Sequence, residues 1–294
     1  MKRVVILSSI VATFVFSAEL QWGHGTIDLK GGFIGLDQTI SDDIDTYSLV
    51  EVHKNILNSN WFYSYDITLL DSKKIKQLQK NYNTGASAAN SVLNKLGVKD
   101  SYITIPELEY RVAGADVGLA LGYDILHKSK SDYLGVGLYT GLSVPYIKSS
   151  KSATKTVSAN IDVAKYFKDS KTEFLTYKIG VGVYAQKSLN DMVSIYGNSA
   201  YAYQRANITN DYIKADFDVD GSYFEAGAGL KFHVIKADAG ILSPRLYGTI
   251  GWKYRKWKVD DVALNISGIS ALKTPKSDME FSTNTFTVGI GYSF

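Results

Sequence analysis

The chain contains no cysteine among its 294 residues. It therefore forms no disulfide, no zinc–thiolate site and no cysteine nucleophile. Proline is also scarce, with four residues against 25 glycines and 21 tyrosines, a balance typical of many extended strands. The mean hydropathy is close to zero, which is low for a domain with a large dry core. These absences favour an all-β chain with one apolar and one wetted face per strand.

Residues 1–18 resemble a secretory leader, and no apolar run of 18 residues follows them. Lys2 and Arg3 precede an uncharged apolar stretch over residues 4–16. This stretch is shorter than the ~20 residues that a membrane-spanning helix needs. We therefore expect an exported protein whose leader is cleaved at Ala18 or one residue earlier. Without disulfides, closing a sheet on itself is one way for such a protein to hold together.

Neither sign of charge dominates the chain. There are 32 basic and 29 acidic residues, and loss of the leader removes two of the basic ones. A nucleic-acid-binding protein would normally be more basic, so we expect no nucleic-acid partner. Phosphate-binding loops, H-E-x-x-H and EF-hand sequences are absent as well, and we expect no cofactor and no metal.

Segments of ten or more residues alternate with a period of two, most clearly at the C-terminus. There Phe286, Val288, Ile290, Tyr292 and Phe294 fall on one face, with serine, glycine and threonine between them. Strands of globular proteins usually have ~5–6 residues, whereas a tilted membrane strand needs ~9–11. Lipid outside and water inside would explain both faces, and closure leaves no backbone group unpaired in hydrocarbon.

The last nine residues resemble the C-terminal signature of Gram-negative outer-membrane β-barrels. The resemblance implies one barrel domain over residues 19–294, located in the cell outer membrane. It also implies contact with outer-membrane lipid and lipopolysaccharide, and recognition of the C-terminal strand by the outer-membrane assembly machinery. It does not indicate an oligomeric state.

We predict twelve antiparallel strands, with ten or fourteen as alternatives. An even number returns both termini to the periplasmic side. The segment near 72–96 carries apolar residues at helical spacing and predicts a helical extracellular loop, either a plug in the lumen or a hairpin on the rim. The predicted strands lie near 22–34, 45–54, 61–70, 102–112, 115–127, 132–147, 154–166, 172–186, 192–206, 221–235, 243–257 and 281–294.

Charges on the predicted lumenal faces are unevenly distributed. The early strands carry mostly acidic residues, including Asp66 and Asp124, and the later strands mostly basic ones. If water fills the space between these walls, their field would orient dipolar solutes, as selective pores do. If the walls meet, the same charges pair and close the lumen. The predicted pore-lining residues are Asp28, Glu107, Glu109, Arg111, Asp116, Lys178, Glu225, Lys231, His233, Arg245, Lys253 and Arg255.

Three functions remain open at this point. We predict a passive, porin-like channel for small polar solutes, with a structural or surface-contact barrel of closed lumen as the alternative. The third is a lipid-active enzyme, because His127 and Ser129 resemble the His-x-Ser element of outer-membrane phospholipases and lipid-A deacylases. Lys130 stands where those families have asparagine, and no residue is assigned to orient the imidazole. We therefore expect no enzyme and assign no catalytic residue.

Overall fold

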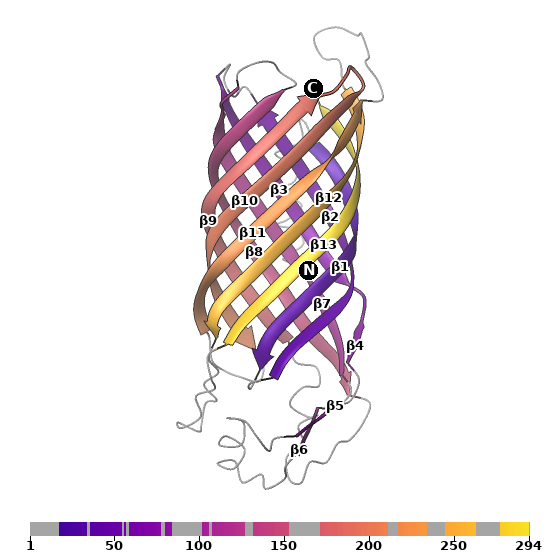
Figure 1. Ribbon diagram of the computed structural model, residues 1–294, viewed down its shortest axis with the longest axis vertical. Coiled ribbons are helices and arrows are strands. Elements are labelled where there is room, and N and C mark those ends of the chain that lie inside the picture. Colours follow the sequence, from indigo (N-terminus) through magenta and orange to yellow (C-terminus); the bar gives the residue numbers. More distant parts are fainter. Residues whose placement is uncertain are drawn as a thin grey trace, which may run out of the picture.

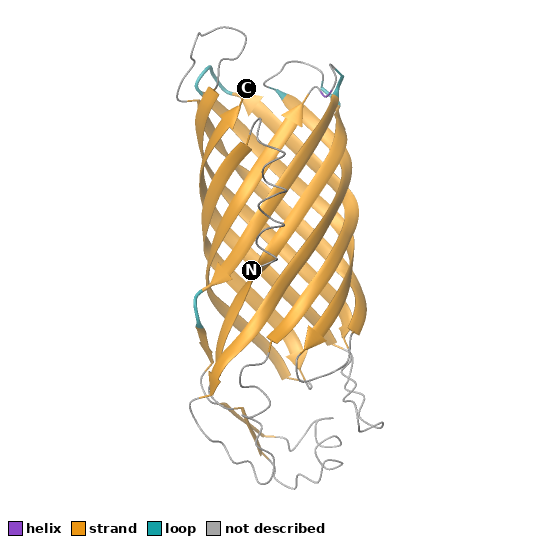
Figure 2. Cartoon of the chain, turned by 180° about the vertical axis from the view of Figure 1, so that it is seen from behind, coloured by secondary structure: helices purple, strands orange, loops and turns teal. Residues whose placement is uncertain are grey.

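A computed structural model describes most of the chain, in long strands. The described residues are 18–33, 36–54, 56, 59–77, 80–83, 102–105, 108–126, 132–152, 171–210, 217–233, 245–262 and 277–293. Ten long strands run obliquely to one common axis (Figures 1 and 2). They are β1 (Ala18–Phe33), β2 (Leu36–Lys54), β3 (Trp61–Ser72), β7 (Leu108–Asp124), β8 (Tyr133–Ser152), β9 (Lys171–Ser188), β10 (Val193–Asn210), β11 (Phe217–His233), β12 (Arg245–Val262) and β13 (Ser277–Ser293).

The ten strands form a closed antiparallel barrel in which each strand pairs with its neighbours in the sequence. β3 pairs with β7, and β1 pairs with β13, which closes the ring. Short β4 (Ile75–Gln77) extends the ladder along β7, and β5 (Lys80–Asn83) pairs with β6 (Tyr102–Ile105) in a separate hairpin. No helix in the described ranges is long and apolar enough to cross a membrane.

The half of the barrel that holds the termini has an apolar outer wall. Leu138 is 70% exposed there, Ile179 64% and Leu20 63%. Such a wall is costly in water and favourable in hydrocarbon, and we call this part the membrane half. Its exposed apolar residues include Leu20, Trp22, Tyr47, Trp61, Leu119, Leu121, Tyr123, Val136, Leu138, Leu142, Tyr177, Ile179, Val181, Val183, Ile195, Tyr201, Tyr203, Phe224, Ile250, Trp252, Phe286, Val288, Ile290 and Tyr292.

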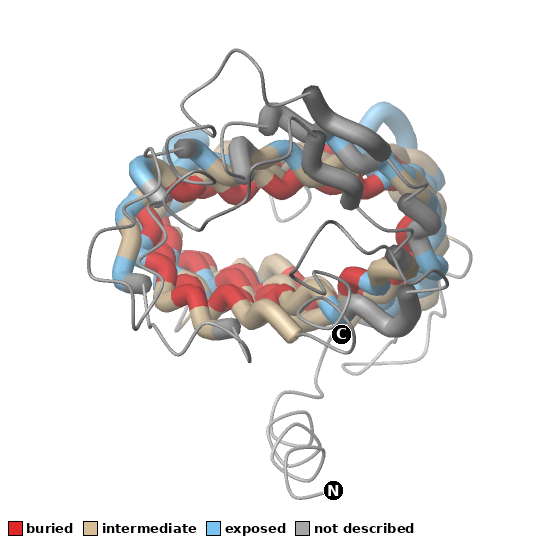
Figure 3. The backbone as a smooth tube through the Cα atoms, turned by 90° about the horizontal axis from the view of Figure 1, so that it is seen from below, coloured by how far each residue is buried: buried red, intermediate tan, exposed pale blue. Residues whose placement is uncertain are grey.

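Toward the other end of the barrel, the apolar residues of the strands occupy the inward-facing positions instead of the outward-facing ones. On β1, Leu20 and Trp22 point outward, but further along the strand Ile27 points inward and is 1% exposed. The outward positions next to Ile27 are polar, and Thr26 is exposed among them. Seen along the axis, the wall is a flattened ring with buried residues toward the inside (Figure 3). The apolar side chains therefore change from the outer to the inner face without any change in backbone register.

The same inversion occurs around the barrel and defines a projecting half. Its interior is apolar, with buried Ile27, Ile44, Leu70, Val112, Phe174, Ala206, Ile208, Trp257, Val259 and Phe281. Its outer wall carries paired charges, including Arg111 with Asp71, Lys73 with Asp43, Lys74 with Glu109, Arg205 with Asp218, Lys256 with Glu280, and Lys258 with Asp278. The hydrogen bond from Lys258 holds the pKa of the Asp278 carboxyl below its usual range. A wall of this composition belongs in water.

The strand lengths agree with this division. β8 has 20 residues, and β7, β11 and β13 have 17 each. A strand of ~17 residues, rising ~3.3 Å per residue and tilted by ~40°, spans roughly 43 Å along the axis. The apolar band of an outer-membrane barrel is only ~25 Å tall. β3, β8 and β12 end in the projecting half, and β7, β9 and β13 begin there, with long stretches of sequence between the members of each pair. We therefore assign this end to the extracellular side.

The prediction of twelve strands was wrong, because it assumed that every strand ends at the membrane surface. Residues 108–112 of one predicted segment and 115–124 of the next belong to one strand, β7, which continues through Gly114, while residues 102–105 form the separate strand β6. The segment 154–166 lies outside the described residues, and β8 pairs directly with β9. The barrel therefore has two strands fewer than predicted. Because the number stays even, β1 still begins at the end of the barrel where β13 ends.

The predicted helix near 72–96 was also wrong where the structure describes it. Residues 75–77 and 80–83 form β4 and β5, and residues 84–101 lie outside the described part. β4 pairs with the start of β7, where β3 has already ended. Such long-range pairing supplies backbone hydrogen bonds that the local spacing of apolar residues does not reveal.

The two halves predict different chemical reactivity at introduced cysteines, and the cysteine-free chain gives no background. In lipid nanodiscs, Thr26→Cys in the projecting half should react rapidly with a water-soluble maleimide. Val181→Cys, 56% exposed in the membrane half, should react slowly because lipid covers it. Both variants should react equally once unfolded in urea. Slow labelling of Thr26→Cys would contradict this division, because it would mean that lipid extends along the barrel as far as Thr26.

Candidate functional site

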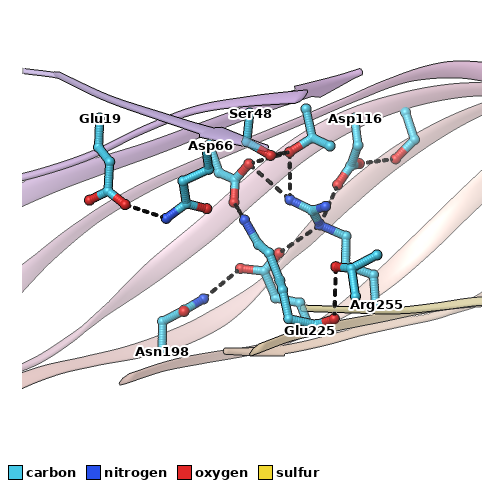
Figure 4. Close-up of polar contacts among 12 residues, drawn as sticks. Glu19, Ser48, Asp66, Asp116, Asn198, Glu225 and Arg255 are labelled. Atoms are coloured by element: carbon cyan, nitrogen blue, oxygen red, sulfur yellow. Dashed lines mark hydrogen bonds and ion pairs between the residues drawn. The ribbon is translucent and has the colours of Figure 1, made fainter. Parts of the chain in front are cut away.

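The centre of the barrel interior is occupied by an arginine from β12. Arg255 is 1% exposed, and one of its terminal nitrogens lies 2.9 Å from Asp66 Oδ1 and 2.7 Å from Thr68 Oγ1, both on β3. Its Nε lies 3.4 Å from Asp116 Oδ2 on β7. Figure 4 shows the guanidinium between the two aspartates. Because β12 is not a neighbour of β3 or β7, these contacts cross the lumen.

Two lysines complete the ionic contacts. Lys253 of β12 binds Asp66, and Lys178 of β9 binds Asp116. Lys178 Nζ also lies 3.7 Å from the centre of the Tyr223 ring, which adds a cation–π contact. The third carboxylate, Glu225 of β11, has an oxygen 3.9 Å from Arg255 Nε. Three cations thus face three carboxylates, and we call these six residues the lumenal charge network.

Uncharged side chains hold the carboxylates of this network in place. The Tyr223 hydroxyl lies 2.7 Å from Glu225 and 3.1 Å from Asp116. Ser143 donates to Asp116 and accepts a hydrogen bond of 3.0 Å from Trp257 Nε1. In a medium of low dielectric constant, a charge is tolerated only when such partners satisfy it. The network is therefore a bonded unit that links both walls.

Aromatic contacts bridge the lumen at further levels. In the projecting half, the rings of Phe174 (β9) and Phe281 (β13) are 4.7 Å apart in an edge-to-face arrangement. In the membrane half, Phe62 (β3) and Tyr184 (β9) are 5.5 Å apart. Neither pair comes from neighbouring strands. Side chains thus meet across the barrel in three layers, with the charge network between two aromatic contacts.

A second polar group lies closer to the termini. Glu19 accepts hydrogen bonds from Gln21, at 2.6 Å, and from Thr249. Lys231 Nζ lies 3.6 Å from the centre of the Tyr247 ring. No group of three or more His, Cys, Asp or Glu in the described ranges is arranged to hold a metal ion.

The structure brings seven of the predicted pore-lining residues inside the barrel and places three on its outer wall. Asp28 accepts a hydrogen bond from Ser41 outside, and Glu109 and Arg111 form the outer ion pairs described above. The prediction assumed that every polar face points inward, which fails in the projecting half. Glu107 lies outside the described residues, and Arg245 is the first residue of β12. The inward residues are Asp116, Lys178, Glu225, Lys231, His233, Lys253 and Arg255.

Sequence reasoning overlooked the uncharged members of the site. Thr68, Ser143, Tyr223 and Trp257 share the inward parity of their strands, which was the available signal. The Arg255–Thr68, Trp257–Ser143 and Tyr223–Asp116 contacts join strands that are not neighbours, so no local pattern identifies these contacts. The enzyme alternative rested on His127 and Ser129, which lie outside the described residues. The flanking ends of β7 and β8 lie at the end of the barrel that holds the termini.

The apolar residues of the C-terminal signature face outward from the barrel. Phe286 is 58% exposed on the outer wall, Ile290 57%, Tyr292 37% and Val288 36%. Phe294 lies outside the described residues. In the described part of β13, the apolar face therefore contacts the surrounding medium and not a dry interior.

Comparison with known proteins supports the same fold. No family model and no curated protein sequence matches the chain. The crystal structure of the outer-membrane protease OmpT from Escherichia coli matches with a TM-score of 0.51 and 8% identity, covering 95% of this chain and 97% of that one. The chain has the fold of an outer-membrane β-barrel. The apolar wall of the membrane half agrees with this fold, because such a wall is favourable in hydrocarbon.

Two other matches are outer-membrane barrels of lower similarity. The attachment invasion locus protein Ail of Yersinia pestis matches with a TM-score of 0.30 and 10% identity, covering 95% of this chain and 99% of that one. The outer membrane protein OprG of Pseudomonas aeruginosa matches with a TM-score of 0.29 and 13% identity, covering 95% and 96%. We draw no functional argument from either.

Removing the central arginine of the charge network should strongly destabilise the barrel. Arg255→Met leaves three buried carboxylates with only two lysines as counter-charges, and we expect a loss of about 3–5 kcal/mol in the free energy of unfolding. Arg205→Met is the control, since Arg205 is 61% exposed in its ion pair with Asp218; that change should cost about 0–1 kcal/mol. Reversible urea unfolding from lipid vesicles measures both. Equal effects of the two substitutions would contradict the central role of Arg255.

Proposed function

We propose that this outer-membrane β-barrel has a closed lumen and acts through its projecting half, as a surface-contact protein. The observation that carries the proposal is the lumenal charge network, in which Arg255 binds Asp66 and approaches Asp116 on the opposite wall. An open aqueous channel keeps its charged walls apart so that water and solute pass between them. Here the acidic and basic walls are in contact.

Packing around the network supports the same proposal. Arg255 is 1% exposed and Glu225 2%, so solvent scarcely reaches the charges that a pore would present. The Phe174–Phe281 contact adds an apolar layer in the projecting half. A passive channel for small polar solutes, as predicted from the sequence, would require both layers to open. Side chains fill the interior of barrels of ~8 strands, whereas 16–18 strands leave a channel. With ten long strands, this barrel is closer in size to those whose interior is filled.

The projecting half supplies the surface that would meet a partner. Its outer wall combines both signs of charge, and cross-strand pairs such as Arg111–Asp71, with two hydrogen bonds of 2.7 and 2.9 Å, hold the side chains in place. A rigid polar wall loses little conformational entropy when it binds. We propose that lipopolysaccharide surrounds the base of this wall and that a polar macromolecule contacts the part above.

The proposal includes no reaction. OmpT is a protease, but 8% identity supports only a shared fold, and its activity is not transferred to this chain. We further propose that the outer-membrane assembly machinery recognises β13 through the face that bears Phe286 and Ile290, since these side chains are exposed until lipid covers them.

Planar-bilayer recording tests whether the lumen is closed. Purified wild-type protein should give no stepwise current at any voltage, because the network and the aromatic layers block a continuous water path. Flotation of the same preparation with lipid vesicles, together with a β-rich circular-dichroism spectrum, controls for insertion and folding.

Stepwise current from inserted wild-type protein would contradict a closed lumen and favour the channel prediction. In that case Lys253→Glu should shift the reversal potential toward cation selectivity, because Lys253 belongs to the inner wall. Arg205→Glu, on the outer wall, should leave the reversal potential unchanged.

A further inference from the structure

Several polar atoms deep in the barrel have no hydrogen-bond partner among the described residues. Thr176 Oγ1 and Gln204 Oε1 belong to side chains that are 2% and 0% exposed. Tyr139 Oη and Arg255 Nε are likewise without a hydrogen bond, in residues that are each 1% exposed. A buried polar atom without a partner is costly, and native proteins usually satisfy such atoms with protein or ordered water.

The residues that carry these four atoms contact or adjoin Asp116 of the lumenal charge network, or a residue that contacts it. Thr176 is the direct cross-strand partner of Ser143, which donates to Asp116. Gln204 is the direct cross-strand partner of Lys178, which binds the same carboxylate. Thr176 and Gln204 are thus each the strand partner of a residue that contacts Asp116.

The other two groups approach Asp116 more directly. Arg255 Nε lies 3.4 Å from Asp116 Oδ2 without forming a hydrogen bond. Tyr139 stacks on Tyr223, whose hydroxyl lies 3.1 Å from Asp116, and a side chain at Gly118 would collide with Tyr139 Oη. The Tyr139 hydroxyl therefore lies beside β7, two residues from Asp116 in sequence.

The chemistry of these groups indicates which ligand they would bind. They comprise one N–H donor, one carbonyl acceptor and two hydroxyls that can do either. The charge network already balances three cations with three carboxylates, so an added ion would be left unpaired. A neutral molecule that both donates and accepts hydrogen bonds fits this set, and water is the smallest.

We infer that the barrel encloses a small hydrated site beside Asp116, in which ordered water bridges Thr176, Gln204, Tyr139 and Arg255. The Phe174–Phe281 contact separates this site from the extracellular end, and Phe62–Tyr184 lies on the other side of the network. The water helps the network to remain charged inside the barrel, because it solvates groups that the walls leave unsatisfied. The site does not depend on what the outer wall contacts.

Two threonine substitutions test the inference. Thr176→Val removes a hydroxyl without changing the side-chain shape, and loss of a water-bound hydroxyl should lower the urea midpoint of unfolding. Thr285→Val is the matched control, since Thr285 is also 2% exposed and donates to the Lys253 carbonyl oxygen at 3.3 Å. We expect both variants to lower the midpoint to a similar extent. If the urea midpoint of Thr176→Val alone were raised or unchanged, no water would bind the Thr176 hydroxyl, and the inference would be overturned.

A high-resolution crystal structure of the wild-type barrel provides an independent measurement that needs no variant. It should show ordered water within hydrogen-bond distance of Thr176 Oγ1 and Gln204 Oε1. Absence of density at both atoms would refute the hydrated site, even if the lumen proved closed in bilayer recordings.

Discussion

Hydrocarbon offers no hydrogen-bond partner to a peptide group, and this constraint underlies the whole architecture. A sheet can enter a bilayer only when every strand has two neighbours. Pairing of β1 with β13 closes the ring. Pairing of β3 with β7 joins the two consecutive long strands that have the most sequence between them. Once the ring is closed, the side chains are free to adapt to whatever lies on each side of the wall.

The outer medium changes from lipid to water along the axis, and the side chains follow it. In the membrane half the apolar groups lie outside and the polar groups inside; in the projecting half this order reverses. Phe281 and Phe286 illustrate the change, because they lie five positions apart on β13 yet face opposite sides. An inward cluster of apolar groups then stabilises the part of the barrel that lipid does not surround.

The lumenal charge network lies at the junction between these two regimes. Asp66 and Asp116 meet cations from β9 and β12, so distant strands are linked by hydrogen-bonded ion pairs. Replacing such pairs with apolar residues is often neutral for stability, whereas breaking one pair is expensive. The network therefore specifies how the two walls meet, and in the function we propose this arrangement closes the lumen.

The sequence alone determined the class of the protein, because a period of two with an apolar face is a local property of a strand in contact with lipid. It also placed acidic residues on early strands and basic residues on later ones. Only the tertiary structure decided that Asp28, Glu109 and Arg111 lie outside and that Arg255 meets Asp66. Alternation identifies two faces but not which of them is wet, and contacts across a lumen join residues far apart in sequence. Both depend on where the closed ring sits relative to lipid and water.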